Sequence, residues 1–385
     1  MRHWRLSGFY FFYFAALGAL VPYWSLYLRS IGLGPARIGL LMALPMISRV
    51  VAPNLWSWIA DARGGDVRVT RIAALAALAC YCGVFLSNRF AWIALVMAAF
   101  TFFWHASLPQ LEAATLLVLG KDYGKVRLWG SVGFIVTVLG LGFALDRFGI
   151  RVLPIALLVL LAGIALFSFW IRHPAMEEPE PLRSSFLGKI LKKPVFAFLV
   201  ACFLMQASHA PYYTFYSIDL VAHGYSEAEI GALWAFAVLC EIGVFMWGRA
   251  LFERVRLGTL FLWTFAAAVV RWLMIGYLYA HPSALIVAQV LHAATFGLYH
   301  ATAVQIAFHF FRGAHRNRGQ ALYGSAAGAG GAIGSLGSGY LWRRLGPAHT
   351  FAIAAGLDVI AFLIVWYLLR RAISSSTGYE SAQTR

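Results

Sequence analysis

Three side chains that can hold or sense a proton stand inside long apolar stretches in the second half of the chain. Glu241 lies in ALWAFAVLCEIGVFMW (Ala232–Trp247), Arg271 in AVVRWLM, and His292 in QVLHAAT. An acid at the centre of a lipid-spanning helix costs about 2.5–3.5 kcal/mol on insertion scales, so a residue of this kind usually carries a function. Carboxyl and imidazole groups change protonation state readily near a buried positive charge. The three residues therefore predict a proton-coupling network.

The spacing along the chain places the three residues at similar depths. Arg271 lies 11 residues before Pro282, and His292 lies 10 residues after it. At 1.5 Å per residue, both are about 15 Å from the turn near Pro282, and Glu241 is about 20 Å from the same side. We expect the side chains to reach one another. A fixed ion-pair network that only specifies helix packing is the alternative.

Three charged residues of the first half stand in or beside apolar stretches. Glu112 and Arg127 lie on either side of a short turn near Gly120, in LPQLEAATLLVLGKDYGKVRLWGSVGF, and we expect them to form or approach a salt bridge. Arg49 stands inside another apolar stretch. Arginine pairs well with a carboxylate, so Arg49 is a candidate for substrate binding. Arg127 is alternatively one more cytoplasmic basic residue, because two lysines stand close to it.

Aromatic residues in two apolar stretches complete the expected solute site. Tyrosine and tryptophan rings can stack on an aromatic solute while an arginine meets its carboxylate. The same rings alternatively anchor the helices at the membrane interface or pack between them. The candidates for substrate contact are Tyr23, Trp24, Tyr212 and Tyr213, and further tyrosines that can line the cavity are Tyr10, Tyr13 and Tyr216.

The composition predicts that all of these residues are held by helices in a membrane. Of the 385 residues, 61% are hydrophobic and only 12% are charged, whereas a soluble domain carries about 25% charged residues. Apolar stretches of about 20 residues recur along the whole chain, which is typical of a polytopic membrane protein. We expect an all-α integral membrane protein with 12 transmembrane helices, roughly at 7–28, 38–60, 70–88, 91–118, 126–146, 150–172, 194–220, 228–248, 257–280, 283–311, 319–342 and 348–370.

The net charge of +16 is explained by orientation in the membrane and does not require a nucleic-acid partner. With both termini in the cytoplasm, 22 of the 31 Lys and Arg residues fall in cytoplasmic segments and 7 in outer loops. This asymmetry follows the positive-inside rule. We expect a multi-pass protein of a bacterial-type inner (plasma) membrane, with both termini cytoplasmic. Its expected partners are the lipid bilayer, a small-molecule substrate and protons, and a monomer is expected.

The sequence carries no pattern typical of an enzyme. It has no GxSxG, HExxH or phosphate-binding loop, and no paired acids at catalytic spacing. Its four cysteines fall inside apolar stretches without further Cys or His at metal-ligand spacing, which favours small buried apolar side chains. We therefore expect no enzymatic activity, metal or cofactor. A non-transporting membrane sensor is a distant alternative, because the longest polar segment, 173–193, is too short for an output domain.

The two halves of the chain match each other. IGLGPARIGLLMA (Ile31–Ala43) matches HGYSEAEIGALWA (His223–Ala235) at an offset of 192, WHASLPQ matches YHATAVQ at 195, and LWGS matches LYGS at 194. Three matches in order at nearly one offset indicate a tandem duplication. Six spans per copy give parallel repeats, the arrangement of major facilitator halves, with a solute site near the midplane. The offset of 192 pairs Arg49 with Glu241, so we expect both to face a central cavity.

The repeat predicts the domain boundaries. The only long polar insert is the Pro- and charge-rich segment HPAMEEPEPLRSSFLGKILKKP, which separates six apolar spans from six. We expect an N-terminal six-helix bundle at 1–172, a cytoplasmic linker at 173–193, a C-terminal six-helix bundle at 194–371 and a cytoplasmic tail at 372–385.

Motifs in both halves resemble the phenylpropionate permease family, a branch of the major facilitator superfamily related to lactose permease and the nucleoside:proton symporters. The resemblance is carried by PYWSLYLRSIGL, ARIGLL, DYGKVRLWGSVGF, HAPYYTFYSIDL, GYSEAEIGALW, VLCEI, VVRW and QVLHAATF. It implies a major facilitator fold of two pseudo-symmetric six-helix bundles. It also implies a proton-coupled symporter of a small organic solute, for example an aromatic carboxylate such as phenylpropionate. A sugar or nucleoside proton symporter, or a drug or metabolite exporter of the same fold, is the alternative.

The resemblance to lactose permease also implies roles for single residues. Glu241, Arg271 and His292 match the glutamate, arginine and histidine that couple protons in helices 8, 9 and 10. Thr295 departs from the pattern, because the related permease has a second glutamate one turn after its histidine. Glu112 and Arg127 look similar to the sugar-binding acid and arginine of that protein, which implies that both are substrate-binding residues.

A charged turn implies a gating segment. Asp61 and Arg63, in DARGGDVR, match the glycine-acid-basic loop between helices 2 and 3 of the superfamily, which implies a gating role. Ser57 stands where the first glycine of that loop belongs. A solvated loop without a gating role is the alternative.

Overall fold

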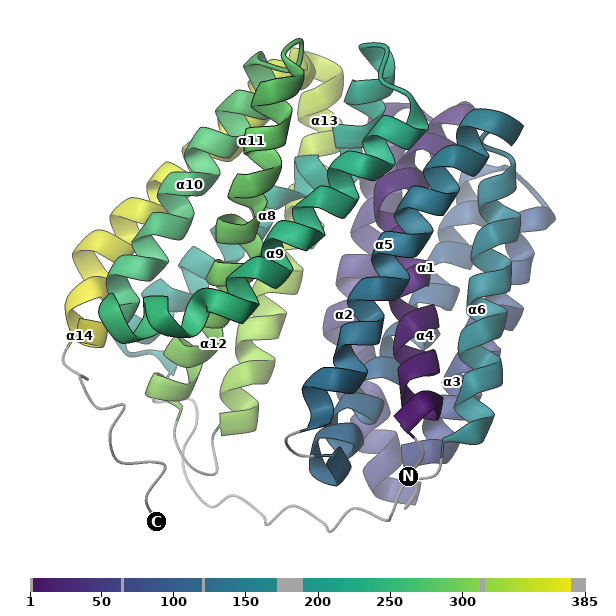
Figure 1. Cartoon of the computed structure of the whole chain (residues 1–385), viewed down its shortest axis with the longest axis horizontal. Helices are drawn as coiled ribbons and strands as arrows, with labels where there is room; N and C mark the ends of the chain where they lie inside the picture. Colours follow the sequence, from purple (N-terminus) through teal and green to yellow (C-terminus); the bar gives the residue numbers. More distant parts are fainter. Residues whose placement is uncertain (1–2, 64–65, 120–121, 172–189, 312–315, 375–385) are drawn as a thin grey trace. The chain divides into compact units, whose positions relative to one another are not determined.

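Long helices make up the described chain, as its apolar stretches predict. The computed structural model describes residues 3–63, 66–119, 122–171, 190–311 and 316–374, and within these ranges no β-strand occurs. A helix satisfies its own backbone N–H and C=O groups, which surroundings without water require. The first helices along the chain (Figure 1) are α1 (His3–Ser30), α2 (Pro35–Arg63), α3 (Asp66–Tyr81), the short η1 (Cys82–Phe85), α4 (Phe90–Leu119), α5 (Tyr123–Phe148) and α6 (Val152–Trp170).

The second part of the chain contains the remaining helices, and two short segments among them are π-helical. They are α8 (Lys193–Ala222), α9 (Glu227–Arg254), α10 (Leu257–Tyr277), α11 (Pro282–His292), the π-helical η3 (Ala293–Leu298), α12 (Tyr299–Phe310), α13 (Arg316–Ile364), the π-helical η5 (Val365–Leu369) and α14 (Arg370–Ser374).

Eleven helical segments of the described chain are long and apolar enough to cross a membrane. The last of them, Arg318–Ile373, has 56 residues, which is about 80 Å of helix, whereas one crossing needs about 30 Å. Gly346 interrupts this segment with a φ of 79°, a left-handed conformation that favours glycine. The segment is therefore long enough for two crossings, which accounts for the twelve expected spans. Large apolar side chains such as Leu95, Phe143 and Val159 are exposed, as lipid-facing residues are.

The chain separates into two compact units. Unit 1 combines Met1–Glu180 with His209–Val238 and Gly331–Thr350, and unit 2 combines Pro181–Ser208, Leu239–Gly330 and Phe351–Arg385. Helices α8, α9 and α13 each contribute to both units. The bundle boundaries predicted at 172 and 194 stay a prediction.

Helix α1 is the central helix of the first six in unit 1. It packs along α5 and α6, while α4 packs against α2 and α3 (Figure 1). The close approach of α1 and α5 depends on Gly133, because a Cβ at this position would collide with the backbone of Phe11. The side chains of Tyr10 and Tyr23 on α1 are fully buried. The central position of α1 thus brings its aromatic residues into contact with several neighbouring helices.

Two glycines allow α5 to contact the beginning of α9 within unit 1. A Cβ added at Gly142 would lie 2.8 Å from the carbonyl oxygen of Glu227, and one at Gly231 would lie 2.6 Å from that of Val138. Real Cβ atoms essentially never approach backbone atoms this closely. Only glycine therefore fits at these two positions without a shift of one backbone.

Hydrogen bonds also join α5 to the beginning of α9. The carboxylate of Asp146 accepts hydrogen bonds from the backbone N–H groups of Glu227 and Ala228, at 2.8 and 3.1 Å. These groups lie in the first turn of α9, where backbone N–H groups lack helical partners and favour a negative charge. The Tyr23 hydroxyl donates to the Val138 carbonyl oxygen at 2.8 Å and lies 3.3 Å from that of Glu227.

We expect Gly142→Leu to separate α5 from α9, because the added side chain has no room between the two backbones. Overpacking of this kind costs about 1–3 kcal/mol of stability, so the melting temperature in detergent should fall. Gly140→Leu is the matched control, since it lies on the same helix and a Cβ there has nothing within 4 Å. Equal melting temperatures for the two variants would contradict the close contact.

Candidate functional site

Glu112 of α4 and Arg127 of α5 form the ion pair expected in the first half. The Arg127 Nε lies 3.5 Å from the Glu112 Oε1, and the Tyr123 hydroxyl donates a hydrogen bond to the same oxygen at 3.4 Å. The side chains of Arg127 and Glu112 remain 35% and 37% exposed. Because they are accessible, both groups can exchange part of their pairing for contacts with a solute.

A second arginine and two aromatic rings surround this pair. The Arg127 guanidinium lies 4.0 Å from the centroid of the Phe14 ring and 6.0 Å from that of Tyr10, which are cation–π distances. Arg49 on α2 is exposed, and its charge acts on the Glu112 carboxylate. Two cations and one acid therefore share this part of unit 1, an arrangement that favours an anionic ligand.

Two of the aromatic residues expected to contact the solute, Tyr23 and Trp24, contact neighbouring helices instead. Tyr23 and Trp24 are fully buried. The Tyr23 hydroxyl donates to the Val138 carbonyl oxygen, and the Trp24 Nε1 donates to the sulfur of Met97 at 3.2 Å. The polar atoms of both residues are used for contacts between helices, which a solute would have to replace.

Tyr212 and Tyr213 of α8 differ in exposure. Tyr212 is fully buried against Trp234, with ring centroids 4.5 Å apart. Tyr213 is half-buried, and its ring lies nearly parallel to that of His209 at 6.0 Å. Of these two residues, Tyr213 therefore has the more accessible ring.

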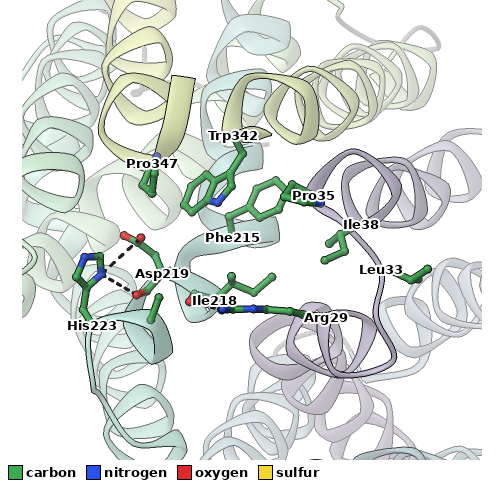
Figure 2. Close-up of a pocket in the computed structure, with 11 residues that line it drawn as sticks. Arg29, Leu33, Pro35, Ile38, Phe215, Ile218, Asp219, His223, Trp342 and Pro347 are labelled. Atoms are coloured by element: carbon green, nitrogen blue, oxygen red, sulfur yellow. Dashed lines mark hydrogen bonds and ion pairs between the residues drawn. The ribbon is translucent and has the colours of Figure 1, made fainter. Parts of the chain in front are cut away.

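A pocket of about 320 Å³ in unit 1 contains none of the residues expected from the sequence. Figure 2 shows Arg29 along one side of it and Trp342 and Pro347 on the other. Asp219, only 4% exposed, lies beside His223 with 3.6 Å between Oδ1 and Nδ1. The sequence analysis missed this acid, although it is the one charged residue of the apolar run YYTFYSIDLVA.

The proton-coupling candidates lie in unit 2, around a π-helical turn. The His292 Nε2 lies 4.0 Å from the Glu241 Oε2, and the two side chains are 5% and 17% exposed. The His292 ring stacks on Phe296 within the turn η3, with centroids 5.3 Å apart. Gly297 in the same turn leaves room for Glu241, because a Cβ there would lie 2.9 Å from the Glu241 Cγ. Such π-helical turns are frequent at functional sites.

Arg271 of α10 is fully buried against the same turn. Its Nε donates to the Ala288 carbonyl oxygen at 2.9 Å, and one terminal nitrogen donates to the Thr295 hydroxyl at 3.2 Å. Thr295 is the position at which the sequence departs from lactose permease. The structure places a neutral hydroxyl there as an acceptor for the guanidinium. The turn η3 therefore contacts Glu241, Arg271 and His292 together.

A fully buried acid in unit 2 was also missed by the sequence analysis. Asp358 of α13 is 0% exposed, and its Oδ2 accepts a hydrogen bond from the Trp272 indole nitrogen at 2.8 Å. The available signal was a lone acid in the apolar run AAGLDVIAF.

The gating residues fall where the structure gives no side chains. Asp61 and Arg63 belong to the end of α2, outside the residues whose side chains are described, and their role stays a prediction. Arg49 and Glu241 belong to different units, so a shared cavity also stays a prediction. Within the described ranges, no group of three or more His, Cys, Asp and Glu residues is arranged to hold a metal ion.

Comparisons with known proteins decide the family. A family model described as the MFS_1-like family matches residues 3–353, which is most of the chain. The chain belongs to the MFS_1-like family. It is a membrane transporter of the major facilitator superfamily and not an enzyme, as the motifs implied.

Relatives of this MFS_1-like protein include transporters of several solutes. It is 33% identical over 360 residues to the "Probable 3-phenylpropionic acid transporter" of Escherichia coli, covering 91% of this chain and 94% of that protein. It is 28% identical over 373 residues to the maltose permease of Geobacillus stearothermophilus, covering 94% and 93%. The crystal structure of the nucleoside transporter NupG matches with a TM-score of 0.82 at 16% identity, covering 95% and 98%. The expected major facilitator fold is confirmed.

Exchanging the charges of Glu112 and Arg127 tests whether this MFS_1-like transporter needs the pair itself. We expect Glu112→Arg and Arg127→Glu each to abolish transport, because each leaves two like charges at 3.5 Å. The double variant should regain part of the uptake of whichever solute the wild-type protein transports. A double variant as inactive as the single ones would show that the positions of the two charges matter as well as their pairing.

Proposed function

We propose that this transporter is a proton-coupled symporter of a small aromatic carboxylate. The observation that carries the proposal is the Glu241–His292 pair, 4.0 Å apart, beside the π-helical turn that also contacts the fully buried Arg271. Ionisable residues inside apolar spans mark proton relays in transporters. The relative named for 3-phenylpropionic acid, at 33% identity, supports the choice of solute. An inner-membrane location, cytoplasmic termini and a monomeric state belong to the same proposal.

Glu241 is the proposed proton site. Its side chain is 17% exposed, so it can exchange a proton with water that enters the transporter. A protonated Glu241 is neutral, whereas an ionised one needs a nearby cation, which Arg271 or a charged His292 can supply. A conformational change that alters the distance to these cations therefore binds or releases a proton.

The solute is proposed to bind in unit 1, separately from the proton. Arg49 and Arg127 provide positive charge for a carboxylate, and Tyr213 provides an accessible ring. The pair with Glu112 keeps Arg127 oriented in the absence of solute. A bidentate contact from one arginine fixes the planar carboxylate, while the aromatic end of the solute needs apolar contact only.

Transport of a sugar or nucleoside is the second candidate function. The Glu112 carboxylate and the Tyr123 hydroxyl, 3.4 Å apart, offer the hydrogen-bonding groups that a polyhydroxylated solute requires. The maltose permease relative also favours this reading. Export of a drug or metabolite uses the same machinery in the opposite direction.

Proteoliposomes with an imposed pH gradient test the proposal. We expect radiolabelled 3-phenylpropionate to accumulate when the outside is acidic, and a protonophore to abolish the accumulation. Unlabelled aromatic carboxylates should compete, and maltose and uridine should not. Competition by maltose or uridine alone would favour the second candidate function, and uptake that ignores the gradient would contradict proton coupling.

We expect Glu241→Gln to abolish gradient-driven accumulation and to leave counterflow exchange of the solute. Glutamine keeps the size and hydrogen-bonding capacity of the side chain but cannot release a proton, and exchange does not require deprotonation. The two assays on one proteoliposome preparation give the measurement. Glu253→Gln is the matched control, because Glu253 lies on the same helix and is exposed. Accumulation by Glu241→Gln would move the proton site elsewhere, with His292 as the first candidate.

A further inference from the structure

The Arg127 guanidinium has three close neighbours within unit 1. Its Nε lies 3.5 Å from the Glu112 Oε1. Its central carbon lies over the ring of Phe14, 4.0 Å from the ring centroid, where the negative face of the ring attracts the cation. One of its terminal nitrogens lies against Gly130, three residues later on α5. Together these contacts fix where the positive charge of Arg127 lies.

Gly130 provides the space that this arrangement occupies. A Cβ at this position would lie 2.9 Å from the Arg127 Nη1 and 2.7 Å from the Phe14 Cδ2. Both distances are shorter than real Cβ atoms show. The guanidinium and the ring therefore fill the place of the side chain that the glycine lacks, and a larger residue would displace one or both of them.

Phe14 reaches Arg127 because α1 packs along α5. Tyr10 lies four residues before Phe14 on α1, and its ring centroid is 6.0 Å from the same guanidinium. Residues four apart lie on one face of a helix, so α1 presents two rings to one arginine. Helix packing alone requires only an apolar side chain at position 14. The face of an aromatic ring adds attraction for a cation.

The contacts leave part of the guanidinium available to a solute. The Arg127 side chain remains 35% exposed, and a guanidinium carries five N–H donors in a rigid fork. A carboxylate binds most strongly when two parallel N–H groups meet its two oxygens. An arginine that is already held in one orientation loses less side-chain freedom when it binds such a group.

We propose that Phe14 is a positioning residue of the solute site, which holds the Arg127 guanidinium where it meets the carboxylate and thereby sets the preference for an anionic over a neutral solute. Gly130 leaves the space that this position of the guanidinium requires. The inference rests on the proposed function, because it assigns the carboxylate of the solute to Arg127. The effect of Phe14 passes through Arg127, so it acts on the charged end of the solute and not on its aromatic end.

The test compares 3-phenylpropionate with its neutral amide, 3-phenylpropionamide, in proteoliposomes that contain Phe14→Leu. Leucine keeps an apolar side chain but has no ring face. We expect the KM for 3-phenylpropionate to rise about two- to fivefold with little change in the maximal rate, as the loss of a partly exposed cation–π contact predicts. The inhibition constant of the amide should stay at the wild-type value. Phe14→Tyr keeps the ring and should retain the wild-type KM.

Gly130→Ala disturbs the same arrangement from α5. The added methyl group takes the place of the guanidinium and the ring edge, so this variant should lose preference for the acid over the amide as Phe14→Leu does. Gly140→Ala is the matched control, because it lies on the same helix and a Cβ there has nothing within 4 Å. It should keep the wild-type preference.

The ratio of the two constants separates positioning from packing. A packing defect alone would weaken the acid and the amide equally, so equal weakening in Phe14→Leu, or an unchanged preference, would overturn the proposal. If Phe14→Leu does not insert, the same two outcomes in Gly130→Ala decide. A wild-type protein that does not take up 3-phenylpropionate, or that binds the acid and the amide equally, instead contradicts the proposed function.

Discussion

The permanent charge of a fully buried guanidinium constrains the whole of unit 2. Arg271 cannot lose its proton, and no water reaches it in the described structure, where it is 0% exposed. The protein must therefore supply acceptors from its own backbone and side chains, and these include the Ala288 carbonyl oxygen and the Thr295 hydroxyl. The carbonyl oxygen belongs to α11 and the hydroxyl to the π-helical turn η3 that follows it.

The π-helical turn η3 contacts two ionisable residues at once. It presents Thr295 to Arg271, and it places Gly297 where a side chain would collide with Glu241. A larger residue at Gly297 would displace the acid that His292 contacts. The same few residues thus position an arginine, an acid and a histidine, which explains why the ionisable groups of α9, α10 and α11 converge there despite their separation along the chain.

The sequence predicts how deep a residue lies in the membrane better than it predicts the direction in which its side chain points from the helix axis. Glu112 and Arg127 flank one turn, so their pairing follows from a short connection, and the depth of Glu241 and His292 follows from counting residues at 1.5 Å each. Tyr23 illustrates the limit, because its hydroxyl bonds to Val138, a contact that depends on how α1 is rotated. Asp358 lies 86 positions from Trp272, and no local pattern connects two residues so far apart.

The two kinds of polar contact in this transporter differ in how easily they break. The hydrogen bonds from Glu227 and Ala228 to Asp146 are exposed, so water can replace each at a net cost of about 0.5–1.5 kcal/mol. The hydrogen bonds of Arg271 are buried and involve a charged donor, so the loss of one costs more, about 1.5–3 kcal/mol. The exposed contact between α5 and α9 therefore suits a joint that opens in every transport cycle. The buried contacts with the Ala288 carbonyl oxygen and the Thr295 hydroxyl instead suit a guanidinium that stays fixed against α11 and η3.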